Sequence, residues 1–286
     1  IPSGNGEKVV LRLLDKQVGR LQLTKLGMNN KTYEMIQKII HRPHGILLVT
    51  GPTGSGKTTT LYAALQELNN NELNISTVED PVEYFIDGIN QTQINNKVKM
   101  SFAKGLRAIL RQDPDVVMLG EVRDSETAKI AVQASLTGHL VFSTLHTNTA
   151  VGAISRLRDM GVEPFLLSSS LSAVLAQRLI RTLCPECKES HTPDAKETEK
   201  LSLDKESVIY QSHGCDHCNQ TGFIGRSALY ELLMIDEGIK ALIYNEASEA
   251  EILSAANSHS TLADQAKQMV IEGNTSIYEA IRVVSL

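Results

Sequence analysis

Residues 51–58 read Gly51-Pro52-Thr53-Gly54-Ser55-Gly56-Lys57-Thr58, and Thr59 follows. Two glycines separated by four residues, with Lys and Thr directly after the second, have the spacing of a loop that binds phosphate groups. Glycine lets successive backbone N–H groups turn toward an anion, the lysine reaches the β- and γ-phosphates, and the threonine hydroxyl binds Mg²⁺. Residues 51–59 therefore predict a site for ATP and Mg²⁺, with Lys57 on the phosphates and Thr58 on the metal.

The segments on either side of this loop have the order that it requires. Residues 46–50 form a short, mostly apolar run, which is typical of a buried parallel strand. After the loop, apolar residues recur at helical spacing from Thr58 to Leu68. Because strand, loop and helix agree, the alternative of a glycine-rich turn with a solvated lysine is disfavoured.

The same alternation continues along the chain. Strand-like runs lie at 75–78, 116–119 and 140–144, and helical patterns lie at 29–40, 102–110 and 127–136. This order predicts an α/β fold in which helices cover both faces of a parallel sheet. After Pro164 the periodicity predicts a helix to about Arg181, and from Ala228 onward the chain reads as mostly helical.

Acidic residues follow two strands of the predicted sheet. Glu121 ends the apolar run that begins at Val116 and resembles a Walker B element. At the carboxyl end of a strand it points into the ligand crevice, where it orients the attacking water or holds Mg²⁺ through water. Glu79 also follows a strand and competes for the role of base. His146 follows the strand 140–144, which places it to sense the γ-phosphate, although a lone histidine is more often structural.

The four cysteines form two Cys-x-x-Cys pairs separated by 27 residues: Cys184, Cys187, Cys215 and Cys218. In a cytosolic chain such pairs favour a metal over disulfides. Four thiolates complete a tetrahedral shell around Zn²⁺, so the predicted site is structural. His213 and His217 lie close by in the sequence and are interpreted as bystanders.

Composition excludes several classes of function. The net charge is -5 and the pI is near 5.9, which disfavours a surface that coats nucleic acid. No apolar stretch approaches the roughly 20 residues needed to cross a bilayer, and residues 1–6 lack the layout of a signal peptide. These features predict a soluble cytoplasmic protein.

Four motifs occur together: GPTGSGKTTTLY from Gly51, TVEDPVEY from Thr77, LRQDPDVVMLGEVRD from Leu110 and TGHLVFSTLHTN from Thr137. In this combination the chain resembles the bacterial secretion ATPases of the type II secretion and type IV pilus assembly family. The resemblance implies a RecA-like core. It also implies that 51–58 is the Walker A motif, 76–84 the Asp box, 116–123 the Walker B motif and 138–146 the His box.

The resemblance further implies a homohexamer in which arginines contact phosphate or a neighbouring subunit. The matching positions here are Arg12, Arg107, Arg111 and Arg123. The expected domains are the tail of a preceding domain with its linker (1–27), the RecA-like core (28–183), the tetracysteine zinc module (184–218) and a C-terminal helical subdomain (219–286). The expected partners are inner-membrane platform proteins, through which alone the protein reaches the membrane.

The predicted function is ATP hydrolysis that drives pseudopilus assembly and protein export by a type II secretion system. The tetracysteine element argues against pilus retraction, because retraction motors in this family generally lack it. The alternatives are a type IV pilus assembly ATPase, a DNA motor with a zinc ribbon, and a non-hydrolysing scaffold. Low aromatic content (4%) argues against the DNA motor, and the intact Lys57, Thr58, Glu79 and Glu121 argue against the scaffold.

Overall fold

A computed structural model describes residues 2–4, 6–7, 22–70, 72–201, 208–256 and 260–284. Its centre is a seven-stranded sheet in the order β11-β8-β3-β7-β6-β4-β5. The strands are β3 (Gly45–Thr50), β4 (Ile75–Glu79), β5 (Asn90–Gln93), β6 (Val116–Leu119), β7 (Leu140–Leu145), β8 (Leu171–Leu183) and β11 (Phe223–Met234). All neighbouring strands pair in parallel except β11 with β8.

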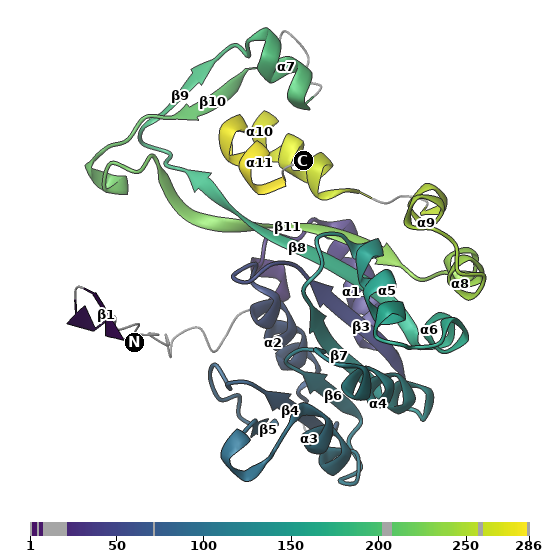
Figure 1. Ribbon diagram of the computed structural model, residues 1–286. Coiled ribbons are helices and arrows are strands. Elements are labelled where there is room, and N and C mark those ends of the chain that lie inside the picture. The colour runs from purple at the N-terminus through teal and green to yellow at the C-terminus, as the bar shows by residue number, and fades with distance from the viewer. Residues whose placement is uncertain are drawn as a thin grey trace.

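Helices cover both faces of this sheet, as predicted (Figure 1). They are α1 (Asn30–Ile40), α2 (Lys57–Leu68), α3 (Phe102–Ile109), α4 (Ser125–Leu136), α5 (Ala150–Asp159) and α6 (Pro164–Ser170). Successive side chains of β3 point to opposite faces of the sheet. Ile46 and Leu48 lie in one hydrophobic core with α3 to α6, whereas Leu47 and Val49 lie in a second core with α1 and α2. Because β3 is buried on both faces, it reads as a continuous apolar run.

The prediction of a helix from Pro164 to about Arg181 is wrong beyond Ser170. Helix α6 ends there, and β8 begins at Leu171 and pairs in parallel with β3. The first seven residues of β8 are all buried. A strand buried on both faces has no two-residue alternation, and periodicity alone does not separate it from a buried helix.

The prediction of helix from Ala228 onward is also wrong for its first residues, because β11 continues to Met234. The chain after β11 is helical as expected: α8 (Glu237–Tyr244), α9 (Glu249–Ala255), α10 (Leu262–Ile271) and α11 (Ile277–Val284). Helices α10 and α11 share a small hydrophobic core with Ile180 of β8 and Leu229 of β11. The long β8–β11 hairpin therefore joins the C-terminal helices to the sheet.

The cysteine segment is inserted between β8 and β11 and extends away from the sheet (Figure 1). It contains β9 (Lys188–His191), α7 (Ala195–Leu201), β10 (Ile209–Ser212) and the 3₁₀ turn η4 (Asp216–Cys218). Two further 3₁₀ turns are η2 (Leu23–Lys25) and η3 (Asn96–Val98).

The amino-terminal region contains the short strands β1 (Pro2–Ser3) and β2 (Gly6–Glu7). Arg12 lies outside the described residues, as does most of the expected tail of a preceding domain. Among the described residues, no helix is long and apolar enough to cross a membrane.

Candidate functional site

The loop 51–56 links the end of β3 to the start of α2, as the sequence predicts. Gly51 has φ of 150°, and a Cβ there would lie 2.4 Å from the backbone oxygen of Gln177. Gly56 has φ of 87° and precedes the first residue of α2. These two positions require glycine, and they let the chain turn into the N-terminus of α2, where the free N–H groups of a helix favour an anion.

Lys57 is held inside this loop. Its side chain is 9% exposed, and Nζ donates hydrogen bonds to the carbonyl oxygens of Gly51 (2.9 Å) and Pro52 (3.0 Å). Burial lowers the pKa of Lys57, and the nearby Glu121 carboxylate opposes that shift. The ammonium group is therefore positioned at the loop, where phosphates are the expected partners.

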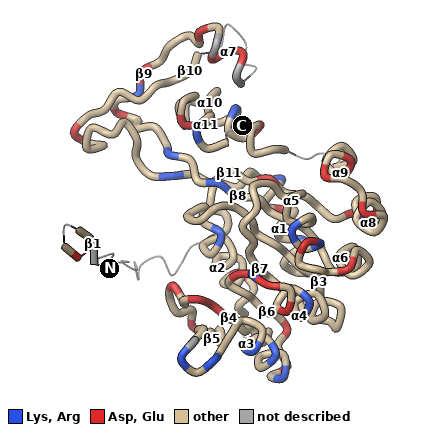
Figure 2. The backbone as a smooth tube through the Cα atoms, viewed as in Figure 1, with Lys and Arg blue, Asp and Glu red and all other residues tan. Residues whose placement is uncertain are grey.

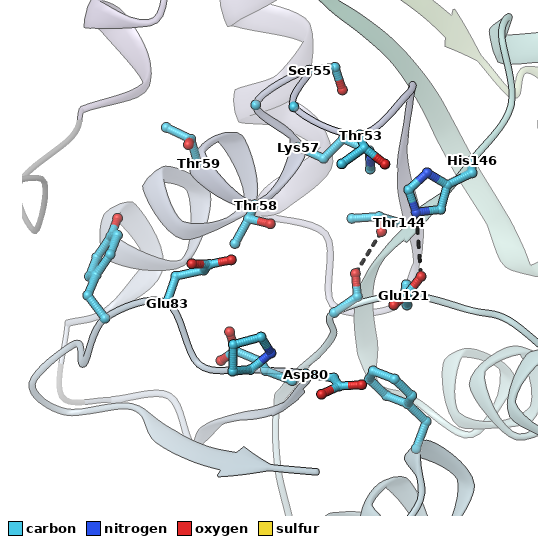
Figure 3. Close-up of a pocket in the computed structure, with 17 residues that line it drawn as sticks. Thr53, Ser55, Lys57, Thr58, Thr59, Asp80, Glu83, Glu121, Thr144 and His146 are labelled. Atoms are coloured by element: carbon cyan, nitrogen blue, oxygen red, sulfur yellow. Dashed lines mark hydrogen bonds and ion pairs between the residues drawn. The ribbon is translucent and has the colours of Figure 1, made fainter. Parts of the chain in front are cut away.

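A cavity of about 510 Å³ opens beside the loop (Figure 3). Its lining brings together residues from four predicted motifs: Thr53, Gly54, Ser55, Gly56, Lys57, Thr58, Thr59, Glu79, Glu121 and His146. A volume of this size is typical of small-molecule and cofactor sites. Gly51 and Pro52 do not line the cavity, and their carbonyl oxygens accept hydrogen bonds from Lys57.

Glu121 lies two residues beyond the end of β6 and is next to His146 in the cavity (Figure 3). Its carboxylate forms an ion pair with Arg123, and Nε2 of His146 lies 3.4 Å from the carboxylate. Arg123 also approaches Asp80 at 3.7 Å. The Walker B, His and Asp boxes thus meet in one group of charges, with Glu121 only 16% exposed.

Glu79 lies deeper, at the end of β4, and is 2% exposed. Tyr62 donates a hydrogen bond to its Oε2, and Thr77 donates to its Oε1 at 2.5 Å. Gln91 donates to Oε1 at 3.2 Å. Burial raises the pKa of Glu79, and these donors oppose that rise.

No contact with Glu79 was predicted for Tyr62, Thr77 or Gln91, although Tyr62 and Thr77 lie within two of the quoted motifs. Thr77 had a usable signal, because residues two apart on a strand share a face and Thr77 precedes Glu79 by two. Tyr62 and Gln91 had none, because they reach Glu79 only after α2 and β5 have packed on the sheet.

The other predicted arginines lie away from the cavity. Arg107 pairs with Glu126 at 2.7 Å on the surface, and Arg111 is exposed. Neither lines the cavity. Their role at a subunit interface stays a prediction, as does that of Arg12.

The four cysteines come together as the spacing predicts. Their sulfur atoms lie within 4.8 Å of one another, with 3.8 Å between Cys184 and Cys215 and between Cys187 and Cys218. A tetrahedral site with Zn–S bonds of about 2.3 Å requires sulfur atoms about 3.8 Å apart. Backbone N–H groups of Gly214 and Gly222 donate to the sulfurs of Cys187 and Cys218 at 3.3 and 3.1 Å. The donor set and its spacing therefore fit a zinc ion.

The neighbouring histidines do not join this cluster. Nδ1 of His213 lies 3.4 Å from Glu189, and Nδ1 of His217 lies 3.6 Å from Glu186. Among the described residues, the four cysteines are the only group of three or more His, Cys, Asp or Glu side chains whose ligand atoms lie close enough together for one metal ion.

Known proteins resemble this chain along its whole length. Residues 1–282 match a family model described as Type II/IV secretion system protein. The chain is 58% identical to Type II secretion system protein E of Pseudomonas aeruginosa and 58% identical to Type II secretion system ATPase E of Vibrio cholerae. Each match covers 99% of this chain and 57% of the relative, so the chain spans little more than half the length of these proteins.

Solved structures with the same fold include the pilus retraction motor PilT with bound ADP. That structure is 32% identical and covers 92% of this chain and 66% of its own, with a TM-score of 0.69. The ATPase DotB of Legionella pneumophila is 24% identical, with a TM-score of 0.65 over 91% of this chain and 64% of its own. The DotB match supports the fold alone.

Proposed function

Since the chain belongs to the type II/IV secretion system protein family, we propose that it is the ATP-hydrolysing part of a type II secretion motor. Hydrolysis would drive assembly of a pseudopilus and export of folded proteins. The observation that carries this proposal is the cavity at the loop 51–59, where Lys57, Glu79, Glu121 and His146 converge.

The geometry supports a mechanism for phosphoryl transfer to water. The loop N–H groups and Lys57 would hold the β- and γ-phosphates at the N-terminus of α2. The Thr58 hydroxyl would hold Mg²⁺, which supplies charge neutralisation on these phosphates when bound. The loop therefore positions the phosphates without any covalent step.

Two carboxylates are candidates to accept the proton of the attacking water. Glu121 is held by Arg123 and His146, and Glu79 is held by its three hydrogen-bond donors. The bond between the γ-phosphorus and the bridging oxygen breaks as water attacks, and the water proton passes to the carboxylate. Arg123, which stays charged and pairs with Glu121, would stabilise negative charge on the phosphoryl group.

The assembled motor is proposed to be a homohexamer. The exposed Arg107 and Arg111 would reach a neighbouring subunit, together with Arg12. The motor would act in the cytoplasm, at the inner membrane, through platform proteins. The tetracysteine group would bind Zn²⁺ as a structural ion that folds the module around β9 and β10.

Secretion is favoured over the alternatives by two observations. The relatives at 58% identity carry type II secretion names, whereas the pilus retraction motor is 32% identical. Figure 2 shows Lys and Arg interspersed with Asp and Glu along the described chain, which does not favour a nucleic-acid track.

Complementation in cells tests the proposal. A strain that lacks the gene should lose secretion of its exported proteins, the natural full-length protein should restore it, and the Lys57→Ala variant should not. Loss of surface pili with normal secretion would instead identify a pilus assembly motor, and salt-sensitive retention of DNA by the purified protein on filters would support the DNA motor.

A further inference from the structure

The carboxylate of Glu79 is enclosed by donors from three separate elements. Tyr62 belongs to α2, Thr77 to β4 and Gln91 to β5. Although the side chain is 2% exposed, it lines the cavity beside the loop. A carboxylate buried to this degree depends on its hydrogen-bond partners for both its charge and its orientation.

Tyr62 connects Glu79 to the helix that carries the phosphate loop. It lies five residues after Lys57 on α2, and its side chain is fully buried. The hydroxyl donates to Glu79 and accepts from the backbone N–H of Glu83 at 3.3 Å and from Gln91 Nε2 at 3.4 Å. The hydroxyl of Tyr62 thus joins α2 to the side chain of Glu79, the backbone of Glu83 and the side chain of Gln91.

The ring of Tyr62 is fixed as well. It meets Tyr84 edge to face, with centroids 4.7 Å apart and an angle of 82° between planes. An aromatic ring packed in this way has little freedom to move its hydroxyl. The position of the Glu79 carboxylate relative to Lys57 is therefore set by rigid groups on α2 and β4.

We propose that Tyr62 and Thr77, together with Gln91, are positioning residues that hold the carboxylate of Glu79 at a fixed place relative to the phosphate loop. The proposal rests on the ATPase activity proposed above. Glu79 is one of the two candidate carboxylates for the attacking water, and the three donors act through Glu79. Because Tyr62 lies on α2, the position of the Glu79 carboxylate is tied to the helix whose N-terminus would bind the phosphates.

Tyr62→Phe is the direct test, in the natural full-length protein under steady-state ATP hydrolysis. Removing one hydrogen bond to a charged group is expected to lower kcat about tenfold or more, with KM for ATP changed less than about twofold. The matched control is Tyr230→Phe. Tyr230 is buried in the same hydrophobic core and does not line the cavity. Its hydroxyl donates to the Leu26 carbonyl at 3.0 Å and contacts the Thr60 side chain, whereas the hydrogen bonds of Glu79 come from other residues.

Two readouts separate positioning from a general loss of structure. Loss of a donor disfavours the charged carboxylate, so the acid limb of the pH–rate profile should move to higher pH in Tyr62→Phe and stay in place in Tyr230→Phe. In a Glu79→Gln background, Tyr62→Phe should lower kcat by less than about twofold, because the two changes act on one group.

Thr77→Val serves as a second variant, since it keeps the shape of the side chain and removes one donor. Thr77→Val should also move the acid limb of the pH–rate profile to higher pH. It therefore tests the proposal even if Tyr62→Phe does not fold. A wild-type kcat in both Tyr62→Phe and Thr77→Val would overturn the positioning role. So would a Tyr62→Phe variant that lowers kcat by the same factor with and without Glu79→Gln. Absence of turnover in the wild-type protein would instead overturn the proposed ATPase itself.

Discussion

Glu279 of α11 forms an ion pair with β8 of the sheet, and its replacement by Gln should destabilise the protein in a pH-dependent way. The carboxylate has no exposed surface, and it accepts hydrogen bonds from Arg181 Nη2 at 2.7 Å and from Arg282 Nη2 at 2.6 Å. Arg181 lies on β8 and Arg282 on α11. Glu279→Gln removes the charge that both guanidinium groups share.

The expected magnitude follows from the pKa of Glu279. Burial alone would raise that pKa, but the hydrogen bonds from Arg282 and Arg181 outweigh burial and lower it from 4.5 to about 2. At about 1.4 kcal/mol per pKa unit this shift corresponds to roughly 3 kcal/mol. The arginine side chains are 42% and 55% exposed, so solvent screening reduces the expected contribution to about 2 kcal/mol.

The sign of the pH dependence is fixed by the lowered pKa. The contribution is present in full above about pH 4.5 and is lost as the pH falls toward 2. Urea unfolding followed by circular dichroism suits this chain, which contains no Trp. The free energy of unfolding of Glu279→Gln should be about 2 kcal/mol below wild type at pH 7, and the difference should shrink below pH 4.5.

A control variant separates this ion pair from ordinary surface charge. Glu237→Gln breaks a pair with Lys240 that has the same three-residue spacing, but Glu237 is 89% exposed. It should cost less than about 0.5 kcal/mol. Equal effects of the two variants, or a Glu279→Gln difference that stays constant down to pH 3, would show that the buried Glu279 carboxylate does not stabilise the fold through its charge.

Three further predictions concern the loop, the metal and Arg123. Gly51→Ala should weaken ATP binding at least about tenfold in nucleotide titrations, since its Cβ would meet the Gln177 carbonyl oxygen at 2.4 Å; wild-type affinity would contradict the loop geometry. Elemental analysis should find one zinc per chain, absent from a Cys184→Ser, Cys215→Ser double variant with a less stable fold; a metal-free wild-type protein would exclude the site. Arg123→Ala should lower kcat about tenfold or more while ATP still binds, and unchanged turnover would remove Arg123 from the site.

Much of the site could be predicted because its signals are local in the sequence. The loop 51–58 needs only its own residues and the strand and helix beside it. Glu79 ends a strand, Glu121 and His146 follow strands, and the carboxyl ends of parallel strands meet at one edge of the sheet. The cysteine spacing predicted a cluster that the fold brings within 4.8 Å.

The rest depends on packing that the sequence does not display. β8 reads as a helix because Leu and Ala favour helices and both of its faces are buried. Tyr62 resembles any apolar residue on α2 until the fold places its hydroxyl on Glu79. The enclosure of Glu79 is therefore a property of the tertiary structure.

The rate of phosphate release from ATP by the natural full-length protein decides whether Glu121 directs ATP hydrolysis, when wild type is compared with Glu121→Gln and with Glu237→Gln as a surface control. Loss of a water-positioning carboxylate should leave ATP binding in place and lower turnover at least about a hundredfold, while Glu237→Gln behaves as wild type. Comparing the turnover of Glu79→Gln with that of Glu121→Gln in the same assay shows which carboxylate contributes more to hydrolysis. Turnover of Glu121→Gln close to that of wild type would contradict the role of Glu121, and no turnover in any of these proteins would contradict the assignment as an ATPase.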